Sequence, residues 1–506
     1  MKYLKHFLLG LVYLLPATLY CSYYPIIKLG ETSSMNLELS LPLIWLVLFD
    51  VSAFIYLIRI TPRRHLPGIT DRRFFLFSLF PFFATLSIFW SANPTRALLT
   101  AGIIWLIFFA VFALIYVLPL LKLPANFRRN CLRGLFISTV IICLVCWIQC
   151  FLDLAGLSRD TTLMCRGCTY LSFGFPHPSG LAIEPQFMGN LLLAPTLTAL
   201  YLFIFQPNKK RNERQLLLIF ACLFSATLFL TFSRGAIYAY AVALIVMIIF
   251  AFHRQSFRAS LILIPCATFV FSVAAQGIFT VVGPTHGSFM DGVSRSIHQL
   301  SLGIIDFRPQ SSPSSSIVEN SEQPVDNSSN NVQNSEENSG ENPTQTSNLT
   351  PIINESPAFD GYVAESTNTR LSLNTAALNT WLSQPNTLFF GVGLGGAGTA
   401  MYRNSSITHI NSAKEIVQHQ GINLLLELGL IGVALILLSF YLAFLSSAAR
   451  HNFWHHPALP LLLALIIAYL ITLNFFSGLP NALQIYLMPP LLYLVFRKTI
   501  ALHANE

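Results

Sequence analysis

Charged side chains are scarce in this sequence of 506 residues. Only 10% are Asp, Glu, Lys or Arg, whereas 54% are hydrophobic. A soluble domain typically carries about 25% charged residues. Runs of 18 or more apolar residues recur along the chain, and each can cross a hydrocarbon core of roughly 30 Å. The composition therefore excludes an ordinary soluble domain and predicts a protein that crosses a membrane many times.

Several chemical motifs are also missing. The sequence has no Walker A string, no His-Glu-x-x-His pair and no Asp-rich cluster. These absences argue against an ATP-driven pump and a metal-dependent site, so we expect neither metal nor cofactor. The net charge of +8 comes largely from Lys and Arg in short loops between apolar runs. That pattern is typical of topology signals and does not favour nucleic-acid binding.

The apolar runs predict an all-α polytopic fold. Lipid offers no hydrogen-bond partner to the backbone, so continuous apolar segments must be helical. A membrane β-barrel would alternate apolar and polar residues instead. We expect about twelve transmembrane helices, at 6–24, 39–58, 74–90, 97–121, 135–157, 187–206, 215–232, 235–252, 259–281, 421–446, 457–474 and 484–496.

The basic loops predict the orientation. Clusters such as Arg63-Arg64, Arg128-Arg129 and Lys209-Lys210-Arg211 all fall on one side of these spans, together with both termini. The positive-inside rule assigns that side to the cytoplasm. The expected divisions are nine helices in 1–282, a large external loop at 283–420, and three helices with a cytoplasmic tail in 421–506.

The large loop has two parts of different composition. Residues 309–357 are rich in Ser, Asn and Glu and contain no Lys or Arg, which predicts disorder. Residues 358–420 regain apolar and aromatic side chains, and we expect them to be partly helical, including 369–382, and to form the site. The glycine-rich run 391–396 predicts a tight turn and not a dinucleotide site.

Two arginines of the predicted outer side are candidates for anion binding. Arg234 lies between two long apolar runs, at the mouth of a tight helical hairpin. An arginine in such a place is a functional candidate by default, although it could simply extend to the membrane surface. Arg370 is the first basic residue after 309–369 and precedes Trp381 by eleven positions. A solvated helix face is an equally good interpretation of Arg370.

A third element precedes the tenth predicted helix. His419 lies at its outer entrance, and its ordinary pKa suits a general base near neutral pH. A histidine at a membrane surface can also be merely interfacial. Glu427 lies two turns deeper, where a carboxylate should face the interior of the bundle.

In this order, these elements resemble the O-antigen ligase and polymerase family of bacterial envelope enzymes. The resemblance covers most of the chain, and its motifs are specific only in combination. The matching elements are Trp90-Ser91-Ala92-Asn93-Pro94, Gly180 with Glu184-Pro185, Ser233-Arg234-Gly235-Ala236, Arg370 through Trp381, Pro385, Gly391-Val392-Gly393, and Glu427-Leu428-Gly429. One departure is that the family's His-Asn register falls here on Gln418-His419, so the histidine is offset by one position.

The resemblance implies a GT-C-like, metal-independent glycosyltransferase of the bacterial inner membrane. Its donor would be a glycan on a polyprenyl pyrophosphate, and its acceptor a hydroxyl on lipid A core, another glycan or a protein. Arg234 and Arg370 would stabilise the pyrophosphate, because guanidinium groups bind phosphate oxygens in pairs. His419 would be the general base, and Glu184, Trp381 and Glu427 would contact substrate.

Four functions remain open at this point. An O-antigen ligase is favoured because one large loop dominates, whereas polymerases of this family often show two. A repeat-unit polymerase and a protein O-oligosaccharyltransferase are the alternatives within the class. A flippase or transporter of lipid-linked glycans lies outside it, and the internal repeats typical of transporters are not evident.

Overall fold

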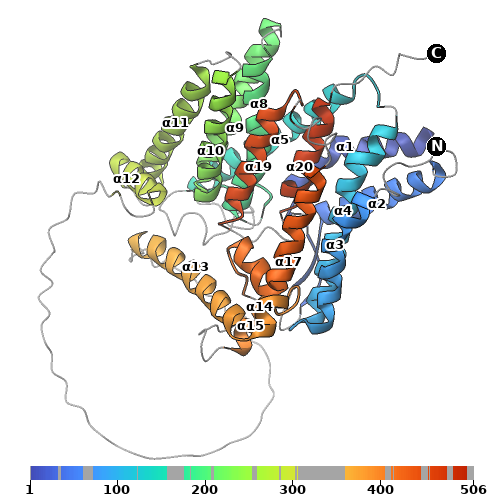
Figure 1. The fold of residues 1–506 in the computed structure, drawn as a ribbon. Coiled ribbons are helices and arrows are strands. Elements are labelled where there is room, and N and C mark those ends of the chain that lie inside the picture. The colour runs from blue at the N-terminus through green and yellow to red at the C-terminus, as the bar shows by residue number, and fades with distance from the viewer. Residues whose placement is uncertain are drawn as a thin grey trace, which may run out of the picture.

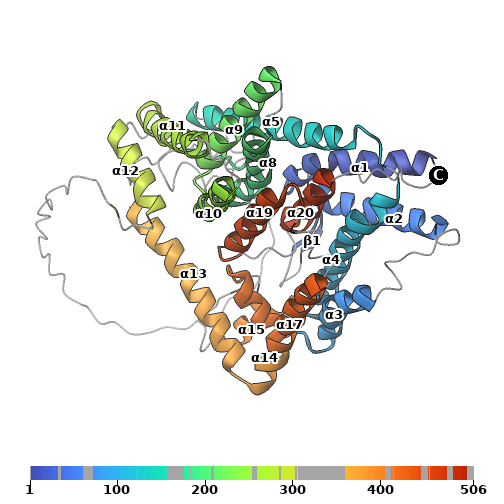
Figure 2. The same ribbon diagram turned by 45° about the horizontal axis from the view of Figure 1, so that its top comes forward.

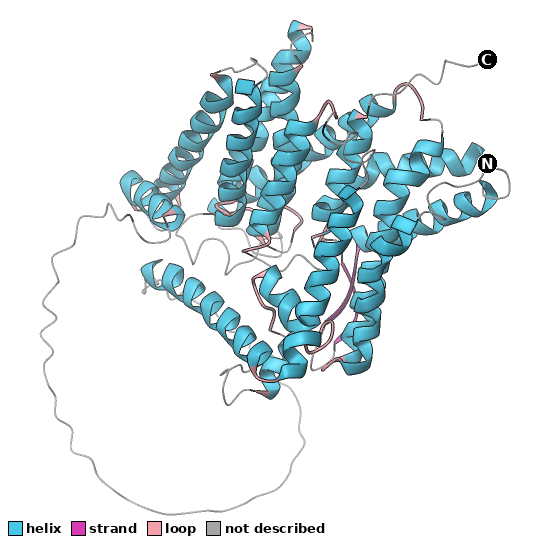
Figure 3. Cartoon of the chain, in the orientation of Figure 1, coloured by secondary structure: helices cyan, strands magenta, loops and turns pink. Residues whose placement is uncertain are grey.

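The structure is a computed structural model in which helices form nearly all of the regular elements (Figures 1 and 3). It describes most of the chain. The described residues are 2–24, 26–31, 36–60, 72–121, 123–155, 176–182, 184–206, 210–253, 259–283, 287–301, 305, 359–404, 412–413, 415–445, 454, 456–475 and 482–497. The segment 309–357 and Lys414 lie outside these ranges. So do Cys165 and Cys168, a Cys-Arg-Gly-Cys pair that could form a local disulfide if its loop faces an oxidising compartment.

The elements follow one another as a long series of helices with one early hairpin. In chain order they are α1 (Lys2–Tyr20), β1 (Ile26–Glu31), β2 (Asn36–Ser40), α2 (Leu41–Ile60), α3 (Arg72–Leu86), η2 (Ser87–Trp90), α4 (Pro94–Phe112), η3 (Ala113–Val117), η4 (Leu118–Leu121), α5 (Phe127–Leu154), α8 (Pro185–Phe205), α9 (Arg211–Leu230), α10 (Arg234–His253), α11 (Ser260–Val282), α12 (Phe289–Leu300), α13 (Phe359–Leu382), α14 (Pro385–Phe390), α15 (Ala397–Arg403), α17 (Gln420–Leu445), α19 (Leu459–Thr472) and α20 (Leu483–Phe496).

Within the described ranges, nine helices are long and apolar enough to cross a membrane. Three shorter apolar helices, at 78–90, 459–472 and 483–496, coincide with three further predicted spans. The prediction of a polytopic helical membrane protein is therefore confirmed. The count of twelve spans stays a prediction, because these three helices have only 10 to 17 residues each.

A short β-hairpin departs from the all-helical prediction. Strands β1 and β2 pair in antiparallel register, with Ile27 opposite Leu39 and Lys28 opposite Glu38. The sequence alternates apolar and polar side chains at Leu37-Glu38-Leu39, a period of two that marks a strand. The prediction treated this segment as a plain connection and missed the pattern because it is so short.

Helix α8 is the centre of one group of helices. From Met188 to Ile204 its side chains are buried on every face, and it packs against α5, α9, α10 and α19. Small residues allow the close approach that stabilises helix pairs in lipid. A Cβ atom on Gly189 would lie 2.9 Å from the Cβ atoms of both Ser233 and Ala236. The start of α8 is therefore held tightly against the α9–α10 turn.

Helices α12 to α15 lie across one end of the bundle, which we call the loop end (Figure 1). Helix α13 extends from the neighbourhood of α12 to α14, along one edge of the view in Figure 2. It packs against α14, α15 and α17. The predicted helix at 369–382 is confirmed, and it begins earlier, at Phe359. Helix α12 is joined to α10 by a hydrogen bond that the Tyr238 hydroxyl donates to the Leu300 carbonyl.

Candidate functional site

Glu184 and Arg370 lie together at the start of α8. The Arg370 guanidinium donates a hydrogen bond of 3.4 Å to the Gln186 side-chain oxygen, which joins α13 to α8. Gln186 also hydrogen-bonds to the half-buried carboxyl of Glu184. Burial raises the pKa of Glu184, and the positive charge of Arg370 acts in the opposite direction. Two residues that are 186 positions apart in the sequence thus share one polar cluster.

The segment before Glu184 is held by α5 and by the turn between α9 and α10. The Gln149 side chain of α5 both donates to and accepts from the backbone of Gly180, at 2.8 Å each. His177 bonds at 3.1 Å to the carbonyl of Thr231, in the α9–α10 turn. Burial lowers the pKa of His177 to about 3, so its ring is neutral near pH 7. This segment is a rigid support for the polar cluster at α8.

Arg234 begins α10, directly after a strained turn. Phe232 has φ 46°, in the left-handed region that side chains other than glycine rarely adopt. Such strain persists only where surrounding contacts hold it, and here His177 packs edge-on against the Phe232 ring with centroids 5.5 Å apart. The turn brings Ser233 against Gly189, one helical turn of α8 beyond Gln186. One turn spans about 5.4 Å, so the α8 contacts of Arg370 and of the Arg234 hairpin are close together.

His419 reaches the same region through α19. The backbone N–H of Gln420, the next residue, donates to the Leu473 carbonyl at the end of α19 (2.9 Å). Two residues further, Phe475 packs on the turn that carries Arg234, since a Cβ atom on Gly235 would lie 2.9 Å from the Phe475 Cβ atom. The structure therefore joins Arg370, Arg234 and His419 by one continuous path of contacts through α8, α10 and α19.

The His419 ring has a defined orientation. Its Nδ1 accepts a hydrogen bond from the backbone N–H of Ile422, with the long distance of 3.3 Å. A nitrogen that accepts a hydrogen bond carries no proton, so the proton of the neutral ring is on Nε2. In this arrangement His419 presents a donor. To act as a base, it must first release the contact with Ile422.

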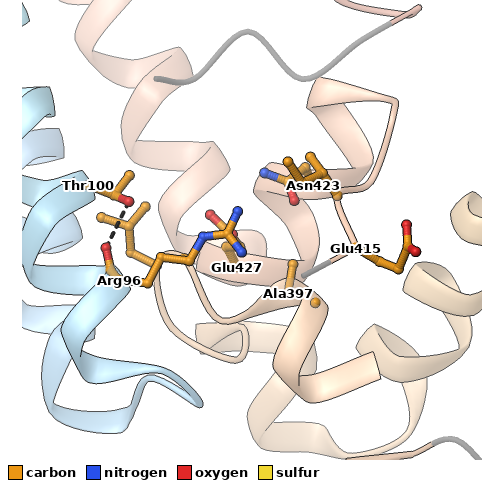
Figure 4. A pocket seen from close by; sticks show the side chains of 10 residues that line it. Arg96, Thr100, Ala397, Glu415, Asn423 and Glu427 are labelled. Carbon is orange, nitrogen blue, oxygen red and sulfur yellow. Dashed lines mark hydrogen bonds between the residues drawn. The ribbon is translucent and has the colours of Figure 1, made fainter. Parts of the chain in front are cut away.

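Glu427 lies away from this path, where α17 meets the glycine-rich run and α4. Its carboxylate accepts hydrogen bonds from the backbone N–H groups of Gly395 and Ala397, and Arg96 faces it (Figure 4). The Leu426 carbonyl accepts from the Val392 N–H at 2.8 Å. Glu427 thus anchors the glycine-rich run to α17. The predicted tight turn is confirmed, with positive φ at Gly391, Gly393 and Gly395.

The glycine-rich run is also held by the turn between α3 and α4. The Ser91 hydroxyl donates to the Leu394 carbonyl (2.9 Å), and the Leu394 N–H donates to the Ser87 hydroxyl (3.1 Å). The indole N–H of Trp90 donates to the Phe390 carbonyl (3.3 Å). Three of the sequence motifs, Trp90-Ser91, Gly391-Val392-Gly393 and Glu427-Leu428-Gly429, therefore meet at a single place.

Trp381 closes the turn between α13 and α14. Its indole N–H donates to the Leu388 carbonyl (3.1 Å), and its own carbonyl accepts from the Thr387 hydroxyl (2.8 Å). These contacts are internal to the loop end, and none of them joins Trp381 to the arginine path. The sequence reasoning also overlooked Gln186, which carries the link to Arg370. Its position two residues after Glu184, at a predicted helix start, was the available signal.

No protein-family model matches this sequence, and a search of curated proteins finds no significant relative.

Proposed function

We propose that this protein transfers a glycan from a polyprenyl-pyrophosphate donor to an acceptor hydroxyl at the outer face of the bacterial inner membrane. The proposal rests on two contacts of α8 that lie one helical turn apart. Arg370 hydrogen-bonds to Gln186, and Gly189 packs against the turn that carries Arg234. Arg370 and the turn that carries Arg234 both meet the beginning of α8, and two arginines near a membrane surface favour a ligand with two linked anionic groups.

The proposed reaction is a single displacement. The acceptor oxygen forms a bond to the anomeric carbon of the donor, and the bond from that carbon to the pyrophosphate oxygen breaks. The leaving pyrophosphate gains negative charge, which Arg234 and Arg370 stabilise without reorganising. Glu184 balances Arg370 before the donor arrives. Because burial raises the pKa of Glu184, its charge is already disfavoured, and the phosphate displaces it more easily.

His419 is the proposed acceptor of the hydroxyl proton. Its contact with Ile422 is long, so little energy is needed to break it. Rotation of the ring then turns the free Nδ1 lone pair toward the acceptor hydroxyl. Catalytic hydrogen bonds often form only in the substrate complex. Glu427 is the less suitable base, because its carboxylate is already engaged by two backbone N–H groups.

Transport is the principal alternative outside this class, and α17 has the broken helix that transporters use. Gly429 interrupts α17 with φ 63° and ψ −170°. In carriers, such breaks expose backbone groups to a ligand. Here the backbone of the loop end occupies the break, since a Cβ atom on Gly429 would lie 2.6 Å from the Gly391 nitrogen. The break in α17 therefore anchors residues 389–391 to this helix, and it does not favour the transport alternative.

The test is a transfer assay with the purified full-length protein and an undecaprenyl-pyrophosphate-linked glycan. Lipid A core, a second lipid-linked glycan and a serine-rich protein are offered as acceptors in parallel. We expect one acceptor to be modified, and Arg370→Ala to lose roughly 10²–10³ of the rate. Arg403→Ala is the matched control, because Arg403 is exposed at the end of α15.

The same assay separates the candidates for the base. We expect His419→Ala to lose turnover, while Glu427→Gln and Lys414→Met retain most of it. Lys414 is normally protonated and would need strong desolvation to serve as a base. Normal turnover by His419→Ala would overturn the base assignment. Failure to transfer to any acceptor, combined with movement of the intact donor across a vesicle membrane, would favour the flippase alternative.

A further inference from the structure

A polar cavity lies between α17, α4 and the glycine-rich run, close to the path of contacts that joins Arg370, Arg234 and His419. Its enclosed part has a volume of only about 30 Å³, and the cavity continues into open space, so that about 460 Å³ is free of atoms in all. Four parts of the chain line it: α4, the glycine-rich run with the start of α15, residues 415–416, and the beginning of α17. Figure 4 shows Arg96 and Glu427 directed toward one another inside it, with Asn423 beside them. A concave place with a few convergent polar groups is typical of a small-molecule site.

The lining has the composition of a site for hydroxyl groups. Arg96 offers N–H donors, Glu427 and the exposed Glu415 offer acceptors, and the amide of Asn423 offers both. Asn423 is only 7% exposed, and it lines the cavity. A bound ligand can therefore supply hydrogen-bond partners to its amide.

The lining does not favour the anionic donor. Arg96 lines the cavity together with the carboxyl groups of Glu415 and Glu427. A pyrophosphate would meet one arginine and two carboxyl groups here, in contrast to the site of Arg234 and Arg370. A neutral ligand with several adjacent hydroxyls matches the paired donors and acceptors. A sugar ring has this chemistry.

The cavity is also at the right distance from the proposed base. The Asn423 N–H donates to the His419 carbonyl at 2.9 Å, so Asn423 lies one helical turn beyond His419, the residue that precedes α17. One turn rises about 5.4 Å, which is comparable with the width of a sugar ring. A ring held by Asn423 can therefore place one of its own hydroxyls at His419.

We infer that this cavity binds a neutral sugar ring of the acceptor, with Asn423, Arg96 and Glu427 as its hydrogen-bonding groups. The inference rests on the proposed function for the identity of the acceptor, and it narrows the acceptor to a glycan. Asn423 is then a residue that determines acceptor specificity and takes no part in the displacement itself. A site built to hydrogen-bond a hydroxyl strongly rejects ligands that lack it.

The kinetic test compares wild-type protein with Asn423→Leu, which keeps the size of the side chain and removes its hydrogen bonds. We expect KM for the glycan acceptor to rise roughly 2- to 12-fold, as the loss of one neutral hydrogen bond predicts, with KM for the lipid-linked donor unchanged. Thr100→Val, at the same cavity, is a second and milder variant. Asn126→Leu is the control, since Asn126 is exposed outside the cavity. An equal rise in both KM values, or no rise, would overturn the inference.

A binding test makes the inference independent of turnover. Full-length protein in lipid nanodiscs is titrated with methyl glycosides of glucose, galactose and N-acetylglucosamine, and contact is followed by saturation-transfer NMR. We expect at least one glycoside to bind wild-type protein and to lose its signal with Asn423→Leu. If no glycoside binds, or if Asn423→Leu binds equally well, the sugar site is wrong. If glycosides bind in this way but no glycan is ever transferred, the proposed function fails and the sugar site stands.

Discussion

The glycine at 393 should be indispensable for docking the loop end onto the membrane helices. Gly393 has φ 84°, and a side chain in the left-handed region costs about 1–2 kcal/mol. A Cβ atom there would lie 2.6 Å from the Ser91 Cβ atom and 2.7 Å from the Ser91 nitrogen. Such overpacking typically costs about 1–3 kcal/mol. If one flanking hydrogen bond is lost as well, Gly393→Ala should weaken the contact between the glycine-rich run and the α3–α4 turn by at least about 3 kcal/mol.

This weakening can be measured as local detachment. At about 1.36 kcal/mol per tenfold change, the detached population of 391–403 should rise about 10²-fold. The helices around α8 should remain folded, because their buried cluster contains no residue of this run. Limited trypsin digestion of purified protein, followed at the exposed Arg403, reports that population when reclosing is fast.

Gly102→Ala is the matched control for Gly393→Ala. Gly102 lies within α4, and a Cβ atom added there would meet no heavy atom within 4 Å. Its substitution should change the cleavage rate little, as is usual for surface positions. Equal cleavage rates for the two variants would refute the argument that close backbone contact with Ser91 fixes the loop end.

Three further predictions concern the polar groups and the predicted loop. Arg234→Lys should reduce transfer nearly as much as Arg234→Ala, by roughly 10²–10³, because lysine cannot bind two phosphate oxygens at once; near-normal turnover would reduce Arg234 to a point charge or a helix anchor. Burial raises the pKa of Glu184 above 4.5, so the folded protein binds the carboxyl proton more tightly than the unfolded chain does. The protonated carboxyl therefore adds to the free energy of unfolding below the unfolded pKa, and this contribution is lost as pH rises through the folded pKa. Glu184→Gln should therefore flatten Tm against pH in that window, and an unchanged pH profile would contradict the shift. Deletion of 309–357 should leave transfer intact, since its composition cannot support a core; loss of activity with normal membrane insertion would count against this.

The sequence by itself determined the class of protein and the position of its helices. Apolar runs must be helical in lipid whatever lies next to them, so the long helices could be predicted without knowledge of their neighbours. The helix around Arg370 and the glycine turn at 391–396 were also accessible, because both depend on local propensity. The β1–β2 hairpin was missed, because a period of two over three residues is too short to recognise.

Only the tertiary structure decided which polar groups meet. Ser91 and Leu394 are 303 positions apart and Arg370 and Gln186 are 184 apart, yet each pair is hydrogen-bonded. A helix predicted from its apolar run has an unknown rotation and unknown partners, because those depend on side-chain packing with distant helices. For that reason the sequence could propose Glu427 as a substrate contact, whereas its hydrogen bonds to Gly395 and Ala397 became evident only from the packing of α17 against the glycine-rich run.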